Sequence, residues 1–137
     1  MKRNIVIAAL ACGFLCAPLM AQTNKNLTSE ISKLQQERLS ALTTVLNEAQ
    51  HSYELVGDFD KFLNARRNWL YAFLDANEKP QVRIEALEKH LTYETKAFDI
   101  LQSGTRLGTS SVTQVAEAKA KLLEFKILLL REKSKQS

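Results

Sequence analysis

The sequence has little of what builds turns, disulfides and metal sites. It holds only four glycines and two prolines in 137 residues, which argues against a turn-rich all-β fold and favours long helices. Two cysteines and two histidines are too few for a disulfide scaffold or a zinc cluster, and no Cys-x-x-Cys-His stretch is present for a c-type haem. With 45% hydrophobic and 25% charged residues, the composition is typical of a globular chain.

The first 21 residues have the three regions of a secretory signal peptide. Lys2 and Arg3 form a positive start, residues 5–20 are uncharged, and Ala21 precedes a polar stretch. We therefore predict cleavage after Ala21. An uncleaved anchor is the alternative, although the apolar run is short for a membrane span, which needs about 20 apolar residues.

Removal of this segment changes the charge and the cysteine count. It leaves 116 residues without cysteine and lowers the formal net charge from +4 to +2, since both cysteines and two basic residues lie in the segment. A net charge of only +2 does not indicate nucleic-acid binding. The predicted location is the periplasm, with outer-membrane association and no stable membrane span after cleavage.

Hydrophobic periodicity predicts an all-α fold. Gly57-Asp58 and Pro80 are typical of helix boundaries, and Ser111 with Gln114 forms a capping-box pattern. Short connections place consecutive helices antiparallel, as antiparallel helical hairpins in a four-helix bundle or extended coiled coil. The expected helices cover about residues 27–56, 58–76, 80–102 and 111–133.

The fourth expected helix is apolar over two adjacent stripes. One consists of Val115, Ala118, Leu122, Phe125 and Leu129, and the other of Val112, Ala116, Ala120, Leu123, Ile127 and Leu130. A helix that is apolar over so broad a face is usually buried, so we favour a central position in the bundle. A self-association surface is the alternative.

The two halves of the chain repeat one plan of helix, glycine-containing turn and helix. Gly108 is followed at fixed spacing by Val115 and Ala118, and Gly57 is followed by Ala65 in a copy two residues shorter. These segments resemble the TolC-like outer membrane efflux channel family, in which such a turn motif marks where a long coiled-coil helix reverses.

The resemblance covers residues 38–133 and implies a role in an envelope or efflux assembly. A channel of that family threads membrane strands of about 9–11 residues between its helices, and no loop here holds a pair of them. The chain would keep only the periplasmic coiled-coil part. It would then act by helix docking, with itself or with other helical envelope proteins as partners.

No catalytic, cofactor-binding or metal-binding set is found in the sequence, so we predict a protein that is not an enzyme. His51 and His90 have no second ligand nearby, which favours structural or surface roles. N-capping explains Asp58 and Asp60. Three glutamates of the third helix are expected on a solvated face beside lysines: Glu85, Glu88 and Glu94.

Arginines and aromatic residues cluster in the second expected helix. Arg66, Arg67 and Tyr71 are candidates for contact with a partner, because arginine, tyrosine and tryptophan are common at interface hot spots. We favour the alternative that Trp69 fills the core while the arginine stems cover its edge.

A periplasmic stress chaperone or a small ligand-binding bundle is the second functional hypothesis. The pairs Leu27-Thr28 and Leu91-Thr92 resemble the start of the LTxxQ motif of periplasmic chaperones. Ile31 and Thr95 stand where that motif has glutamine.

Overall fold

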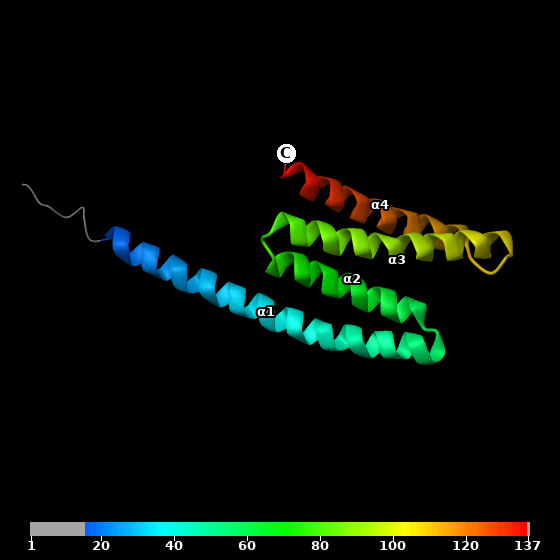
Figure 1. Cartoon of the computed structure of the whole chain (residues 1–137), viewed down its shortest axis with the longest axis horizontal. Helices are drawn as coiled ribbons and strands as arrows, with labels where there is room; N and C mark the ends of the chain where they lie inside the picture. Colours follow the sequence, from blue (N-terminus) through cyan, green and yellow to red (C-terminus); the bar gives the residue numbers. More distant parts are fainter. Residues whose placement is uncertain (1–15, 137) are drawn as a thin grey trace, which may run out of the picture. The chain divides into compact units, whose positions relative to one another are not determined.

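The computed structural model describes residues 16–136, which form four helices and no strand (Figure 1). The all-α class predicted from the sequence is therefore confirmed. Most of the predicted signal peptide lies outside the described residues. The helices are α1 (Cys16–Val56), α2 (Phe59–Ala76), α3 (Pro80–Arg106) and α4 (Val112–Ser134).

The chain divides into two compact units, residues 1–34 and residues 35–137. The described part of the first unit is helical and belongs to α1. Its apolar side chains at Leu27, Ile31 and Leu34 are more than half exposed. The second unit contains the remainder of α1 and all of α2, α3 and α4.

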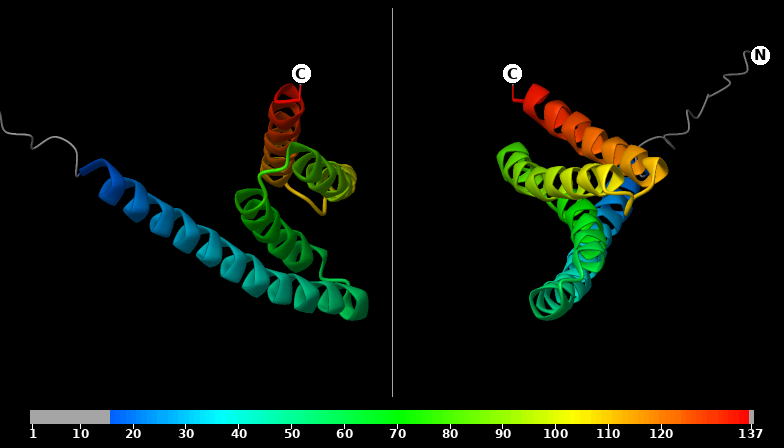
Figure 2. Two further views of the ribbon diagram at one scale, coloured as in Figure 1. Left: turned by 60° about the vertical axis from the view of Figure 1, so that its left-hand side comes forward. Right: turned by 90° about the vertical axis from the view of Figure 1, so that its right-hand side faces the viewer.

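Within the second unit, consecutive helices run antiparallel, and α3 lies beside both α2 and α4 (Figures 1 and 2). The α1–α2 hairpin is held by an aromatic cluster. Phe62 of α2 stacks on Tyr53 of α1 with ring centroids 5.4 Å apart and meets Tyr93 of α3 edge-on at 5.3 Å. The indole N–H of Trp69 donates to the Thr43 hydroxyl of α1 at 3.0 Å.

A second core joins α2, α3 and α4. It consists of Leu70, Leu74, Leu87 and Phe125, all nearly free of solvent contact. Burying a large apolar side chain of this kind contributes about 2 kcal/mol of transfer free energy. Arg83 of α3 secures one end of this core, because its guanidinium donates to the backbone carbonyls of Leu74 and Asn77 and, at 2.8 Å, to Glu132 of α4.

The predicted helix boundaries agree with the structure at the caps. The Asp58 side chain accepts from the Lys61 backbone N–H at 3.1 Å. The capping box of α4 is complete, since Ser111 accepts from the Gln114 backbone N–H and the Gln114 amide oxygen accepts from the Ser111 backbone N–H.

Two boundaries were wrong. The first helix begins at Cys16, eleven residues before the expected start at residue 27, and α3 continues four residues beyond the expected end at Gln102. Gly104 lies inside the helix, and its carbonyl accepts from the Thr109 backbone N–H at 2.8 Å. The left-handed turn falls at Gly108 instead, where φ is +74°. A glycine that ends a helix commonly takes positive φ, and of the two glycines in this region only Gly108 does.

The favoured central position of α4 was also wrong. The first stripe, which we call the inner stripe, faces the core: Ala118, Leu122 and Phe125 are buried. The second stripe, which we call the outer stripe, is exposed over its whole length at Val112, Ala116, Ala120, Leu123, Ile127 and Leu130. The helix is therefore an edge helix with one covered face.

Candidate functional site

The glycines of the repeated turn motif lie at equivalent places in the two hairpins. Gly57 (φ +76°) follows α1 and Gly108 (φ +74°) follows α3, in the left-handed region that favours glycine. In the helix after each turn an alanine is buried: Ala65 in α2 and Ala118 in α4. Val115 is half-buried. The small side chains of Ala65 and Ala118 allow α2 and α4 to approach their neighbouring helices closely.

The three residues considered for partner contact have intramolecular partners. The Arg66 guanidinium lies over the Tyr93 ring, 4.3 Å from its centroid, and Arg66 is 8% exposed. Arg67 pairs with Glu94, and the Tyr71 hydroxyl donates to Glu124 of α4. Burial, together with the bond to this carboxylate, raises the pKa of Tyr71 to about 12. The structure thus uses these side chains to connect α2 with α3 and α4.

Glu94 is the centre of a buried polar network that the sequence analysis missed. Two nitrogens of Arg67 donate to its two carboxylate oxygens at 2.7 Å. The His90 Nε2 lies 2.8 Å from the same carboxylate, and the His90 ring packs edge-on against Phe125 with centroids 4.3 Å apart. Glu94 is 1% exposed and His90 is fully buried.

The expectation that Glu94 belongs to a solvated face was therefore wrong. Burial alone would raise its pKa, but hydrogen bonds from Arg67 and His90 reverse the effect and lower it to about 2. Burial lowers the pKa of His90 despite the bond to Glu94, so the imidazole is neutral near pH 7. The sequence feature that could have indicated this network is a glutamate on the apolar seam of the helix, four residues after a histidine.

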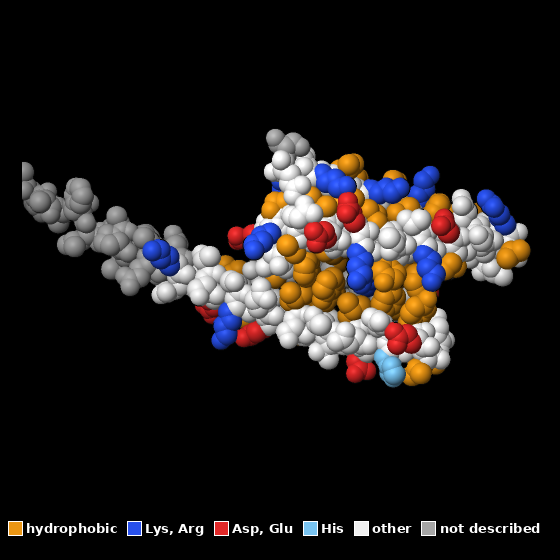
Figure 3. All heavy atoms as spheres, in the orientation of Figure 1, with side chains coloured by type: hydrophobic (Ala, Val, Ile, Leu, Met, Phe, Trp, Pro, Cys, Tyr) orange, Lys and Arg blue, Asp and Glu red, His pale blue; other side chains and the backbone are white. Residues whose placement is uncertain are grey.

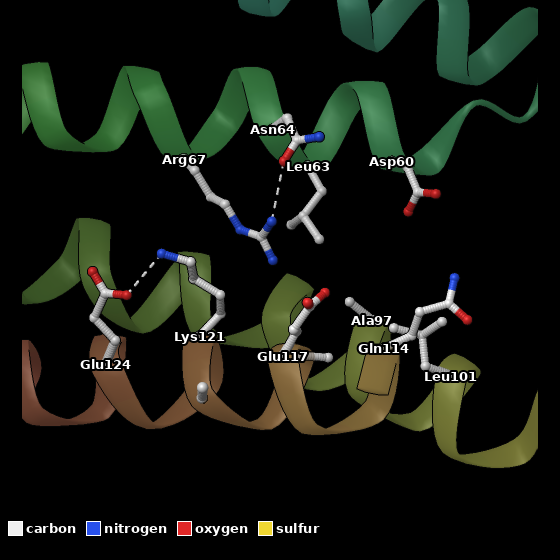
Figure 4. A pocket seen from close by; sticks show the side chains of 12 residues that line it. Asp60, Leu63, Asn64, Arg67, Ala97, Leu101, Gln114, Glu117, Lys121 and Glu124 are labelled. Carbon is white, nitrogen blue, oxygen red and sulfur yellow. Dashed lines mark hydrogen bonds and ion pairs between the residues drawn. The ribbon is translucent and has the colours of Figure 1, made fainter. Parts of the chain in front are cut away.

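A groove of about 550 Å³ opens between α2 and α4 over the floor of α3. In Figure 4, Asp60, Asn64 and Arg67 of α2 face Glu117 and Lys121 of α4 across this groove. The guanidinium of Arg67 is held by Asn64 as well as by Glu94. The groove combines polar walls with a floor that includes Ala97 and Leu101.

The outer stripe of α4 is an exposed apolar surface that runs along this helix of the second unit. The exposed fractions of its large side chains range from 47% at Leu123 to 76% at Val112. Contiguous apolar surface of this kind marks interaction sites on soluble proteins. Figure 3 shows lysine and arginine side chains in blue beside the hydrophobic side chains in orange along α4.

Among the described residues no group of three or more histidine, cysteine or acidic side chains could hold a metal ion. None of the helices in the described part is long and apolar enough to span a membrane. Comparison of the chain with models of protein families, with curated proteins and with solved structures gives no match. The TolC-like resemblance therefore stays a prediction from the turn motifs.

Proposed function

We propose that this chain is a non-catalytic helical protein of the bacterial periplasm that acts by helix docking in an envelope or efflux assembly. The observation that carries the proposal is the outer stripe of α4, which is apolar, repeats in heptads and is uncovered in the described part of the chain. A heptad stripe packs against another helix by inserting its side chains between those of the partner.

Sequence features supply the cellular setting of the proposal. The N-terminal segment has the pattern of an export signal, and the turn motifs resemble those of TolC-like channels. The Arg67–Glu94–His90 network supports a scaffold role, because each of its charged groups is engaged within the fold.

Site-specific photocrosslinking in the native host tests this proposal. A crosslinker at Leu130, in the outer stripe, should capture a defined envelope protein or a second copy, identified by mass spectrometry. A crosslinker at exposed Glu48 of α1 serves as the matched control. The additional change Leu123→Asp should abolish capture from Leu130. A protein that is monomeric at micromolar concentration and gives no stripe-specific product would contradict the proposal.

The groove between α2 and α4 favours a small ligand-binding bundle as the second candidate function. Its volume of about 550 Å³ lies within the range of drug-sized ligand sites. Screening small amphiphiles by thermal shift tests this candidate. A true groove ligand should stabilise the wild type and a Leu123→Ser variant equally, while Asn64→Trp, which narrows the groove, should abolish the shift.

A further inference from the structure

The charges that flank the outer stripe indicate what kind of helix it can accept. When Leu123 and Leu130 are assigned to heptad position d and Ile127 to position a, the residues beside the stripe take positions e and g. One flank then carries a lysine at three of the four g positions of α4, namely Lys119, Lys126 and Lys133, and Val112 takes the fourth. The e positions on the other flank are Glu117, Glu124 and Arg131.

The lysine flank is available for an external partner. Lys119 and Lys126 are exposed and make no ion pair with another described residue, and the only ion pair of Lys133 is with half-exposed Glu88. On the opposite flank, Glu124 already accepts from Tyr71 and Lys121. Glu117 is the one acidic side chain of the flanks that is exposed and has no ion pair among the described residues, so the outward-facing charge beside the stripe is mainly positive.

A second copy of this chain is a poor match for that charge pattern. In an antiparallel pair of stripes, g positions face g positions, so that lysine meets lysine along the whole flank. In a parallel pair, each g position faces the following e position. Lys119 then meets Glu124, which is already engaged, and Lys126 meets Arg131. Each orientation therefore places at least one basic side chain opposite another, which weakens pairing between two copies.

We infer that the outer stripe of α4 docks an amphipathic helix with glutamate or aspartate along the edge that faces the lysine flank, rather than a second copy. Such a partner gives all three lysines an opposite charge, and charges at these positions set partner choice in helix pairs. The inference rests on the proposed docking function and specifies the chemistry of the partner.

Two designed peptides of four heptads test the inference. Both have isoleucine at a and leucine at d; the acidic one has glutamate at every e and g position, and the basic one has lysine there. The like charges keep each peptide from pairing with itself. Binding to the purified protein is measured by fluorescence anisotropy at low and high salt, and we expect the acidic peptide to bind about tenfold more tightly or better.

Variants separate the apolar from the charged contribution. Ile127→Asp should abolish binding of both peptides. Lys119→Glu with Lys126→Glu should shift the preference toward the basic peptide, whereas Lys61→Glu with Lys79→Glu, the same charge change away from the stripe, should leave it unchanged. Circular dichroism confirms that each variant is folded.

The outcomes distinguish this inference from the docking function. Equal binding of both peptides, lost in Ile127→Asp, would overturn the acidic preference and leave docking intact. A concentration-dependent dimer that is lost in Ile127→Asp, or binding to anionic phosphatidylglycerol vesicles in place of the acidic peptide, would also overturn it. Failure of both peptides would overturn the inference, and if Leu130 also gave no crosslinked product the docking function would fall with it.

Discussion

At the scale of single residues, Glu94 connects two helices. A carboxylate can be buried only if its hydrogen-bonding capacity is used, and Arg67 and His90 meet that need from α2 and from the preceding turn of α3. Its position four residues after His90 places both side chains on one face of α3. The network therefore fixes the register of α2 against α3.

Removing this carboxylate should destabilise the fold strongly. We expect Glu94→Ala to lower the free energy of unfolding by about 3 kcal/mol, because it leaves the largely buried guanidinium of Arg67 without a counter-charge. Glu88→Ala on the same helix removes an ion pair between half-exposed side chains and should cost less than about 0.5 kcal/mol. Urea denaturation measures both, and similar losses would contradict this account.

Stability should fall as the pH is lowered from 7 to 5. Burial lowers the pKa of His90 from 6.5, so as the pH falls through 6.5 the unfolded chain takes up a proton before the folded chain does. The free energy of unfolding therefore rises with pH up to about 6.5. Urea denaturation at pH 7.5 and 5.5 should show this slope. His90→Asn should reduce the slope, and His51→Asn, at an exposed position, should retain it.

The contribution of Glu94 to stability changes over a more acidic pH range than that of His90. In the folded chain the pKa of Glu94 is about 2, below the 4.5 that is usual for a free glutamate. The contribution is therefore complete above about pH 4.5 and is lost as the pH falls toward 2.

At the scale of elements, the two hairpins turn at residues with left-handed backbone. Nothing lies within 4 Å of a Cβ atom built at Gly57 or Gly108. Any loss of stability caused by a side chain there therefore comes from the left-handed backbone and not from a steric clash. Gly104 differs, because φ is not positive and a Cβ there would collide with the Ser110 hydroxyl. The same residue type therefore serves a turn in two places and a close contact in the third.

Alanine substitutions should separate these two roles. Gly57→Ala and Gly108→Ala should each lower the free energy of unfolding by about 1 kcal/mol, the cost of a left-handed non-glycine residue. Gly104→Ala should also destabilise, but Ser110→Gly in the same chain should restore part of the loss. Thermal denaturation measures these four variants and a fifth that combines Gly108→Ala with Ser110→Gly, and rescue in the fifth would contradict the assignment.

At the scale of the whole molecule, α4 is covered on one face only. Its inner stripe packs against α2 and α3 through Phe125, which contacts His90 and Tyr71, and its outer stripe faces solvent. The adjacent leucines Leu122 and Leu123 therefore have different roles: Leu122 contributes to folding and Leu123 to the proposed docking.

Leu122 and Leu123 provide a direct comparison. Leu122 is 8% exposed and Leu123 is 47% exposed. We expect Leu122→Ala to cost about 2–4 kcal/mol, as buried leucine truncations do, and Leu123→Ala to cost less than about 1 kcal/mol. Urea denaturation checks the stability difference. Similar costs would mean that the outer stripe is covered when the protein folds.

The helices and most of their ends could be predicted because they depend on local interactions. The apolar period, the Ser111–Gln114 capping box and the turn at Gly57-Asp58 act within a few residues, and each predicted feature is present in the structure. The end of α3 could not be predicted, since the region contains two glycines and local pattern does not tell which one takes positive φ; in the structure Gly108 does, and Ser110 lies close to helical Gly104.

The sequence by itself determined that this chain forms antiparallel helices with two apolar stripes on the last one. Only the tertiary structure decided that the inner stripe joins the core, because both stripes satisfy the helical period and a single layer of neighbours covers just one. The same holds for Glu94, whose burial depends on Arg67, 27 residues away in the chain. Contacts between distant residues, rather than local pattern, therefore set the surface that we propose for docking.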